Sequence, residues 1–370
     1  LLEQAAREKK GVIITSYELL RRDIDIYTGM DFACEVIDEA QFIKNHSTQA
    51  ARAVKQVPAG FRLALTGTPV ENRLSELWSI FDYLMPGFLF SYSRFREEME
   101  TPIVSREDEE TAVRLHKMIR PFVLRRLKKD VLTDLPDKIE KPMMAVMEGE
   151  QSSLYDAHVQ RLIAVLTKQT DQEFAGTQIQ VLSELTKLRQ ICCDPGLLFD
   201  GYEGDSAKTR LCMELIRNAA EGGHKVLLFS QFTSMLERLK SALAKEKISY
   251  YTLDGSTPKV RRLELVESFN KDDTQVFCIS LKAGGTGLNL TAADIVIHFD
   301  PWWNVAVQNQ ATDRAHRIGQ RNVVTVYKLI AKGTIEEKIT ALQEKKKALA
   351  DSILGGEEMG RASFTREELM

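Results

Sequence analysis

The sequence lacks long hydrophobic stretches. Its unbroken apolar runs extend over only a few residues, as at 226–229, whereas a helix that crosses a membrane needs about 20. Apolar residues still make up 44% of the 370 positions and charged residues 28%, which is typical of a globular protein with sizeable cores. The sequence therefore offers no membrane-spanning helix, and its length predicts two or more domains.

Paired cysteines and net positive charge are also lacking. The five cysteines form no Cys-x-x-Cys pair, and we interpret all of them as reduced thiols of a cytosolic protein without a metal cluster. The 50 basic residues are outnumbered by 53 acidic ones, for a net charge of −3. Whole-chain charge gives no sign of a nucleic-acid ligand, so binding of that kind would depend on local basic clusters.

Three local basic clusters are present. They are Arg125, Arg126, Lys128 and Lys129; then Lys259, Arg261 and Arg262; and finally Lys345, Lys346 and Lys347. Charge runs are more often solvated surface than ligand sites. If these clusters do bind nucleic-acid phosphates, the affinity should fall steeply with salt and depend little on base sequence.

The first part of the chain has the pattern of a parallel α/β fold. Short apolar runs at 11–16, 34–38 and 62–66 alternate with helical patterns and are bounded by turn or polar residues. Buried parallel strands have this character. From 87 to 201 the pattern changes to long charged helices, so we predict a helical insertion and linker there. Helical spacing is clearest at 159–167 and 179–191, and strand character is confined mainly to 141–147.

The α/β pattern returns after residue 201. Five strands are predicted there, at 225–230, 249–253, 275–280, 294–299 and 323–328, and a long charged helix follows at 334–354. The predicted fold is α/β, with doubly wound parallel sheets. We place its parts at 1–86 for the first α/β domain, 87–201 for the insertion and linker, 202–334 for the second α/β domain, and 335–370 for the C-terminal helix and tail.

Two predicted strands end in residues suited to phosphate chemistry. Asp38 and Glu39 come at the end of one strand, and Thr66 and Thr68 at the end of the next. Ligands of parallel sheets bind outside the carboxyl ends of the strands. An aspartate there can hold Mg²⁺ through water, and a glutamate can orient an attacking water molecule. A helix cap and a plain turn are the alternative interpretations of the two pairs.

A glycine-rich loop follows the strand at 275–280. Gly284, Gly285 and Gly287 fall within four positions, and their amides can form an anion-binding nest, although glycine is also the default residue of a tight turn. Trp302 and Trp303 follow the next strand. They can be core residues or contact nucleic acid.

Arg314 and Arg317 are three residues apart. On a helix this spacing places both guanidiniums on one face, and guanidinium forks match phosphate oxygens. Four polar side chains beside them can hold them in place: Gln310, Asp313, His316 and Gln320. A solvated helix surface is the more common explanation for two such arginines.

Taken in order, these segments resemble a single family. They are 38–41, 63–69, 226–232, 254–257, 283–294 and 310–320, together with 121–131 and 188–195 in the insertion. The ordered set resembles motifs II to VI of the SWI/SNF-type helicase-like DNA-dependent ATPases of helicase superfamily two. The likeness covers nearly the whole chain.

The resemblance implies two RecA-like lobes that hold ATP and Mg²⁺ and move along double-stranded DNA. It implies that Asp38 holds Mg²⁺ through water, that Glu39 sets the attacking water, and that Arg314 and Arg317 are arginine fingers. The expected nucleotide-binding residues are Gln41, Gly285 and Gln310. The expected DNA-binding and coupling residues are Thr66, Thr68, Gly284, Thr286, Trp303, Lys259 and Arg261. Gln41 stands where many relatives have histidine, and we expect it to alter lobe coupling more than hydrolysis.

One family motif is missing from the sequence. No Gly-x-x-x-x-Gly-Lys-Ser/Thr occurs, and in the family this loop precedes the segment that 11–16 resembles. We therefore expect a chain that begins inside an incomplete first lobe and hydrolyses ATP negligibly alone. The alternatives are a strand-separating helicase and a non-catalytic DNA- or protein-binding scaffold. The expected partner is duplex DNA, with a DNA-bound protein such as RNA polymerase, in a bacterial cytoplasm near the nucleoid.

Overall fold

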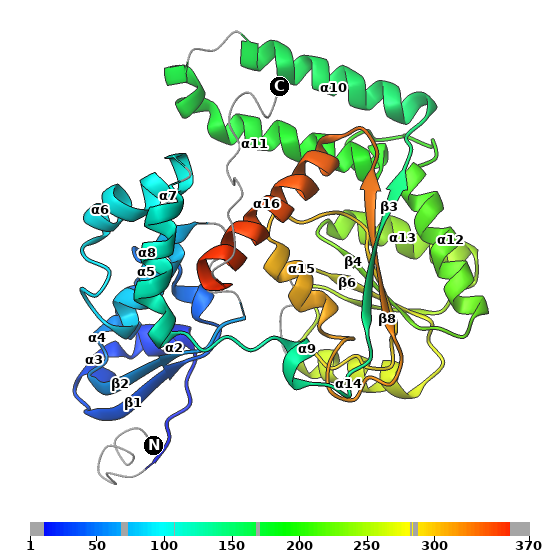
Figure 1. The fold of residues 1–370 in the computed structure, drawn as a ribbon. Coiled ribbons are helices and arrows are strands. Elements are labelled where there is room, and N and C mark those ends of the chain that lie inside the picture. The colour runs from blue at the N-terminus through cyan, green and yellow to red at the C-terminus, as the bar shows by residue number, and fades with distance from the viewer. Residues whose placement is uncertain are drawn as a thin grey trace. The chain divides into compact units, whose positions relative to one another are not determined.

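The computed structural model describes residues 11–67, 73–106, 108–167, 171–281, 283 and 288–355. The chain divides into two compact units, Leu1–Leu124 with Lys345–Ser363 and Arg125–Glu344 with Phe364–Met370. Each unit contains a parallel sheet with flanking helices (Figure 1), so the α/β prediction is confirmed. Within the described residues, no helix combines the length and apolar character needed to cross a membrane.

The first unit contains a two-stranded parallel sheet. β1 (Phe32–Ile37) pairs with β2 (Ala59–Ala64), and Val36 lies opposite Leu63. The surrounding helices are α2 (Tyr17–Arg22), α3 (Ile24–Thr28), η1 (Ala40–Ile43), α4 (Gln49–Gln56) and α5 (Leu74–Leu84). Their apolar faces form a core around Tyr27, Ile43 and Tyr83.

The strand predicted at 11–16 is wrong. These residues have no regular structure, and Val12 and Ile14 are 88% and 92% exposed. A strand needs a neighbouring strand to take up its backbone hydrogen bonds, and β1 and β2 pair with each other instead. Ser16 is the N-cap of α2, because its side chain accepts a hydrogen bond from the Leu19 amide. The segment therefore leads into a helix.

The second part of the first unit is helical. It consists of α6 (Tyr92–Phe95), the π-helical turn η2 (Arg96–Glu100), α7 (Thr101–Arg106), α8 (Glu109–Ile119) and η3 (Arg120–Phe122). These helices share an apolar core with α5 that includes Trp78, Phe95 and Leu115. Part of the segment predicted as an insertion thus packs within the first unit.

The second unit contains a six-stranded sheet in the order β3-β8-β7-β4-β6-β5, with every pair parallel. The strands are β3 (Lys138–Ala145), β4 (Val226–Ser230), β5 (Tyr250–Leu253), β6 (Val276–Ser280), β7 (Ile295–His298) and β8 (Val324–Ala331). The five strands predicted after residue 201 are confirmed. The strand character near 141–147 corresponds to β3, which pairs with β8 at one edge of this sheet.

Helices cover both faces of the six-stranded sheet. α12 (Ala207–Glu221) and α13 (Thr233–Lys245) pack on one face, around Ile216 and Leu239. α14 (Lys259–Lys271) and α15 (Val305–Thr312) pack on the other, around Phe269 and Ala311. The strands are therefore buried on both sides, as in doubly wound folds.

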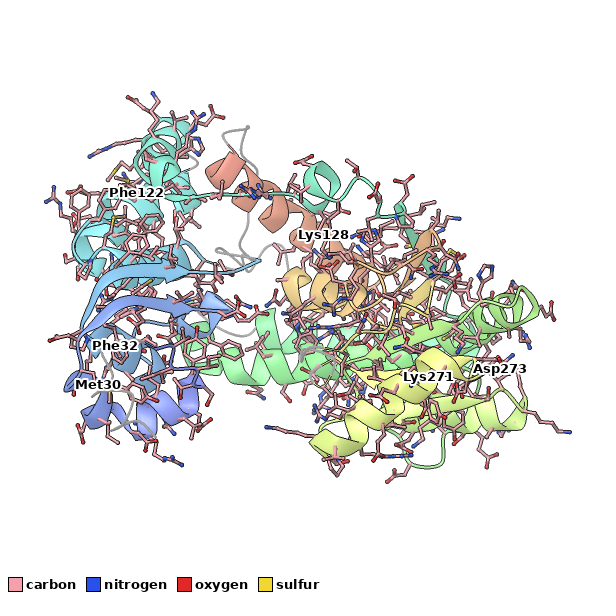
Figure 2. The ribbon with its side chains drawn as sticks, turned by 90° about the horizontal axis from the view of Figure 1, so that it is seen from below. Met30, Phe32, Phe122, Lys128, Lys271 and Asp273 are labelled. Atoms are coloured by element: carbon pink, nitrogen blue, oxygen red, sulfur yellow. The ribbon has the colours of Figure 1, made fainter. Side chains whose placement is uncertain are left out.

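A third group of helices belongs to the second unit. α10 (Gly149–Thr167) and α11 (Asp171–Cys193) form a helical pair, followed by η4 (Pro195–Leu197), and they share a core with the start of α16 (Ile335–Gly355). The helices predicted at 159–167, 179–191 and 334–354 are confirmed. The short helix α9 (Lys128–Val131) precedes β3, and its first residue, Lys128, is labelled in Figure 2.

Candidate functional site

The end of β1 carries the two predicted carboxylates. Asp38 follows the strand, and its Oδ1 accepts a hydrogen bond from the Glu39 amide at 2.8 Å. Glu39 has a φ of +52°, a left-handed conformation that is uncommon for residues other than glycine. Such conformations persist only where the surrounding structure holds them, and they cluster at functional sites. Glu39 shares this conformation with Phe90 and Lys247 among the described non-glycine residues, and of the three it is the one at the end of a predicted strand.

Gln41 links this carboxylate to the next strand end. Its Nε2 donates to Glu39 Oε2 at 2.5 Å, and its Oε1 accepts from Thr66 Oγ1 at 2.8 Å. The backbones also meet, because the Ala40 amide donates to the Leu65 carbonyl oxygen at 2.9 Å. The structure therefore brings Glu39, Gln41 and Thr66 into a single hydrogen-bonded chain.

Tyr17 is a residue of this site that the sequence did not reveal. Its hydroxyl donates to the Asp38 carbonyl oxygen at 2.7 Å. Burial, and then the nearby carboxylates of Asp38 and Glu39, raise the pKa of Tyr17 to about 12. The phenol therefore stays protonated and remains a donor. It lies 21 residues from Asp38 and in no motif, so no local pattern marks it.

The two predicted arginines do not lie on a helix. α15 ends at Thr312, and Asp313 is its C-cap, so Arg314 and Arg317 belong to the irregular segment 313–320, here called the arginine turn. Gly319 has a φ of +104°, which an L side chain rarely adopts. The helical prediction for both arginines is therefore wrong, because α15 ends before them.

The arginine turn is held against the segment that follows the glycine-rich loop. The Leu290 amide donates to the Arg314 carbonyl oxygen, and Arg317 Nη1 donates to the Leu288 carbonyl oxygen, both at 3.0 Å. Gln320 closes the turn by donating to the carbonyl oxygens of Ala293 and Ala315 at 2.8 and 3.1 Å. These contacts bury Arg314, which is 9% exposed, and half-bury Arg317.

A buried histidine supports the helix that leads into the turn. His298, on β7, lies with Nε2 2.8 Å from Thr312 Oγ1, and that hydroxyl donates to the Gln308 carbonyl oxygen at 3.2 Å. Burial lowers the pKa of His298 to about 3, so its ring is neutral. The end of α15 is therefore joined to the sheet by an uncharged hydrogen bond.

The remaining predicted residues are dispersed. Lys259 and Arg261 are exposed at the start of α14, where Arg261 pairs with Glu264 at 2.9 Å. Gln310 is half-buried on α15. The half-buried ring of Trp303 faces the guanidinium of Arg189 at 5.4 Å. Thr68, Gly284, Gly285 and Thr286 lie outside the described residues.

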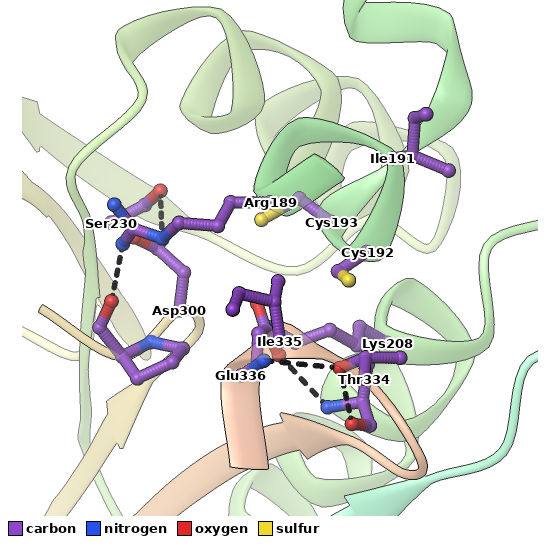
Figure 3. Close-up of polar contacts among 12 residues, drawn as sticks. Arg189, Ile191, Cys192, Cys193, Lys208, Ser230, Asp300, Thr334, Ile335 and Glu336 are labelled. Atoms are coloured by element: carbon purple, nitrogen blue, oxygen red, sulfur yellow. Dashed lines mark hydrogen bonds and ion pairs between the residues drawn. The ribbon is translucent and has the colours of Figure 1, made fainter. Parts of the chain in front are cut away.

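Figure 3 shows a buried polar cluster that sequence reasoning missed. Lys208 Nζ lies 2.8 and 2.9 Å from the two carboxylate oxygens of Glu336, and both side chains are fully buried. Glu336 also accepts from the Ala331 amide. Nearby, Asp300 is buried and accepts from Ser230 Oγ at 2.5 Å. The cluster joins α12, α16 and the strand ends, and no sequence spacing relates residues so far apart.

Two family models match the chain. The SNF2-related domain matches residues 1–197, and the helicase conserved C-terminal domain matches residues 207–319. An uncharacterized ATP-dependent helicase of Mycoplasma pneumoniae is 39% identical over 363 residues, which cover 97% of this chain and 34% of that protein. The putative ATP-dependent helicase/translocase YwqA of Bacillus subtilis is 41% identical over 360 residues, which cover 95% of this chain and 38% of that protein. The chain thus spans about a third of the length of these curated relatives.

A solved structure has a similar fold. The SWI2/SNF2 ATPase core of Sulfolobus solfataricus in complex with dsDNA is 39% identical and superimposes with a TM-score of 0.51, covering 94% of this chain and 74% of that one. The similarity confirms the prediction of two α/β lobes of the SWI2/SNF2 kind. Together with the family model that matches residues 1–197, it shows that this chain belongs to the SNF2-related family of helicase-like ATPases.

Proposed function

We propose that this chain is the core of a translocase that moves along double-stranded DNA and is driven by ATP hydrolysis. The observation that carries the proposal is Glu39, held in a left-handed backbone conformation and hydrogen-bonded to Gln41 at 2.5 Å. The names of the relatives, as ATP-dependent helicases, and the duplex bound to the similar core support it.

In this proposal Glu39 orients and activates the water that attacks the terminal phosphate of ATP. A general base must hold its carboxylate within hydrogen-bond reach of that water. The hydrogen bond from Gln41 restricts the Glu39 side chain, and the bond between Gln41 and Thr66 extends the restraint to the next strand end. Gln41 therefore acts on hydrolysis directly as well as on coupling, which revises our expectation from the sequence.

The residues at this strand end fit a magnesium ion. Asp38 is exposed, and the bond from the Glu39 amide to its Oδ1 orients its carboxylate. Carboxylate oxygens and water are the ligands that Mg²⁺ prefers, so we assign Asp38 to hold the ion through water. When bound, Mg²⁺ supplies positive charge against the phosphate oxygens.

Arg314 and Arg317 supply positive charge to the phosphate during transfer. A guanidinium in a water-poor site stabilises developing negative charge far more than it does in bulk water. Arg314 is 9% exposed, which favours this role. Arg317 has five N–H donors, and Nη1 binds Leu288 in this structure, so Arg317 also connects the turn to the segment that follows the glycine-rich loop.

We assign DNA contact to Lys259 and Arg261, which are exposed at the start of α14. Arg262 is different, because its guanidinium donates to the carbonyl oxygens of Thr257 and Asp254 at 2.8 and 3.1 Å. Its role is therefore to hold the loop before α14. Trp303 packs against Arg189, which supports a packing role for its ring over the contact with DNA that the resemblance implies.

The decisive experiment measures DNA-stimulated phosphate release by the natively expressed protein. Replacing the general base, Glu39→Gln, should lower kcat about 10²- to 10⁴-fold while DNA binding is retained. The matched control is Glu18→Gln, a carboxylate of the same unit that is exposed and pairs with Arg21. Wild-type protein that releases no phosphate with any duplex would overturn the proposal and support a scaffold.

Two strand assays separate translocation from unwinding. A translocase displaces the third strand of a triplex and leaves a plain duplex intact, whereas a helicase separates the duplex too. Because the 370 residues contain no Gly-x-x-x-x-Gly-Lys-Ser/Thr, we propose that this chain by itself hydrolyses ATP negligibly. DNA-stimulated phosphate release from the 370-residue chain at rates usual for the family would contradict that.

A further inference from the structure

The second unit begins with residues 125–137, here called the connecting segment, and these contact the arginine turn of the same unit. Lys128 is the first residue of α9 (Figure 2), and its Nζ lies 2.7 Å from Asp313 Oδ1. The same ammonium donates to the His316 carbonyl oxygen at 3.2 Å. Lys128 therefore binds the chain on both sides of Arg314, at Asp313 before it and at His316 after it.

A second contact ties the turn to the same connecting segment. His316 Nε2 lies 2.8 Å from the Pro136 carbonyl oxygen, and the ring is buried. The next residue, Asp137, accepts the backbone hydrogen bond of Val324 at 3.0 Å, directly before β3 joins β8. Residues 128–137 thus run from the arginine turn to the edge of the sheet and are anchored at both ends.

The contacts made by Lys128 argue against a role as a phosphate ligand. It belongs to the first basic cluster of the sequence, and its side chain is 43% exposed, like the 40% of Asp313. An ammonium 2.7 Å from a carboxylate has much of its charge compensated by that neighbour. The Lys128 ammonium has three N–H donors, and two of its contacts are made to Asp313 and His316 in the arginine turn.

We propose that Lys128 is a positioning residue of the arginine turn, through which the connecting segment of the second unit controls the placement of Arg314 and Arg317. A change in the path of this segment moves Lys128, and with it the carboxylate and carbonyl that flank Arg314. The catalytic consequence rests on the proposed function, whereas the structural restraint is independent of it.

Hydrogen exchange on the 370-residue chain tests the restraint without any nucleotide. Lys128→Gln should speed exchange of the backbone amides at 314–320 about three- to tenfold, the size expected for losing a partly exposed ion pair and a charged hydrogen bond. Asp313→Asn should act in the same direction, and the double variant should be no worse than Lys128→Gln, because Asp313→Asn removes one of the two contacts that Lys128→Gln removes. Lys128→Arg should restore much of the protection.

The matched control is Lys138→Gln. Lys138 pairs with Glu140 at 2.8 Å, has a partly exposed side chain, and lies on β3. This variant makes the same charge change, so exchange at 314–320 should stay as in the wild type. Equal effects of the two variants, or strictly additive effects of Lys128→Gln and Asp313→Asn, would overturn the proposal.

Kinetics of the natural protein then test the consequence. Lys128→Gln should lower kcat three- to tenfold with little change in the KM for ATP, since it misplaces groups that act in the transition state. DNA affinity and its salt dependence should be unchanged. A weaker, less salt-dependent affinity with normal exchange at 314–320 would make Lys128 a phosphate contact and overturn the proposal. If the wild type has no ATPase activity, the proposed function fails. The exchange experiment still shows whether Lys128 restrains the arginine turn.

Discussion

Both sheets of this chain contain strands rich in apolar residues, but the apolar side chains are much more exposed in the first unit than in the second. In the first unit Val36, Phe61 and Leu63 are 52%, 59% and 42% exposed. In the second unit every residue of β4 and β6 is buried. Helices on both faces make the difference. Burial of apolar area is the main source of stability, so the arginine turn rests on the more strongly stabilised sheet and Glu39 on the less stabilised one.

Truncating one phenylalanine in each sheet gives the largest expected contrast. Phe277 on β6 is fully buried, whereas Phe61 on β2 is 59% exposed. Phe277→Ala should cost about 3 to 5 kcal/mol of unfolding free energy, the range for buried aromatic side chains. Phe61→Ala should cost less than about 1 kcal/mol, because the exposed Phe61 side chain buries little apolar area on folding. Denaturant titration monitored by hydrogen exchange in each unit measures both, and equal losses would contradict the comparison.

The buried ion pair offers a second contrast. Lys208→Met leaves Glu336 buried without its partner and should cost about 3 kcal/mol or more. The double variant Lys208→Met with Glu336→Leu should recover most of that loss, because it removes both charges.

The matched pair in the first unit is Lys55 with Asp82, 2.7 Å apart and partly exposed. Lys55→Met should cost about 1 kcal/mol or less, because solvent reaches both charges. A Lys55→Met loss as large as that of Lys208→Met would show that burial does not distinguish the two units.

The smallest expected effect is an opposite pH dependence of the two units. Burial raises the pKa of Glu35 on β1 to about 7, against the lowering effect of Arg62. The folded-state pKa of Glu35 lies above its unfolded value. Its stabilising contribution to the unfolding free energy is therefore complete below about pH 4.5 and is lost as the pH rises through about 7. Burial lowers the pKa of His298 to about 3, so its contribution is present above about pH 6.5 and is lost on acidification.

Single neutral replacements test that sign. Glu35→Gln should remove a pH dependence on the order of 1 to 3 kcal/mol from the first unit, and His298→Gln should remove the acid-side loss from the second. The measurement is denaturant unfolding between pH 4 and 8, with exchange reporting each unit. A first unit that gains stability as the pH rises from 5 to 7 would contradict the assignment of Glu35.

Much of the fold could be predicted because parallel strands are local apolar runs bounded by turn residues. All five strands predicted after residue 201 are present, and the helices at 159–167 and 179–191 follow their spacing. The run at 11–16 also contains consecutive apolar residues but is irregular. Its outcome depended on a pairing partner, which local composition does not specify.

The candidate site was predictable as residue types and not as geometry. Asp38 and Glu39 were marked by their position at a strand end, but the bond from Gln41 to Glu39 and the hydroxyl of Tyr17 required the folded chain. Arg314 and Arg317 were marked by their spacing, yet α15 ends before them. The end of a helix is set by capping and by tertiary contacts, and here Gln320 and Leu290 make those contacts.

By itself the sequence determined the α/β class, the order of the motifs and the identity of the charged groups, because these depend on local patterns along the chain. The tertiary structure alone decided which groups meet. It joined Lys128 to Asp313 and Lys208 to Glu336, pairs separated by long stretches of chain. The reason is physical: the energy of a buried or bridged charge depends on its neighbours in space, and packing sets those neighbours.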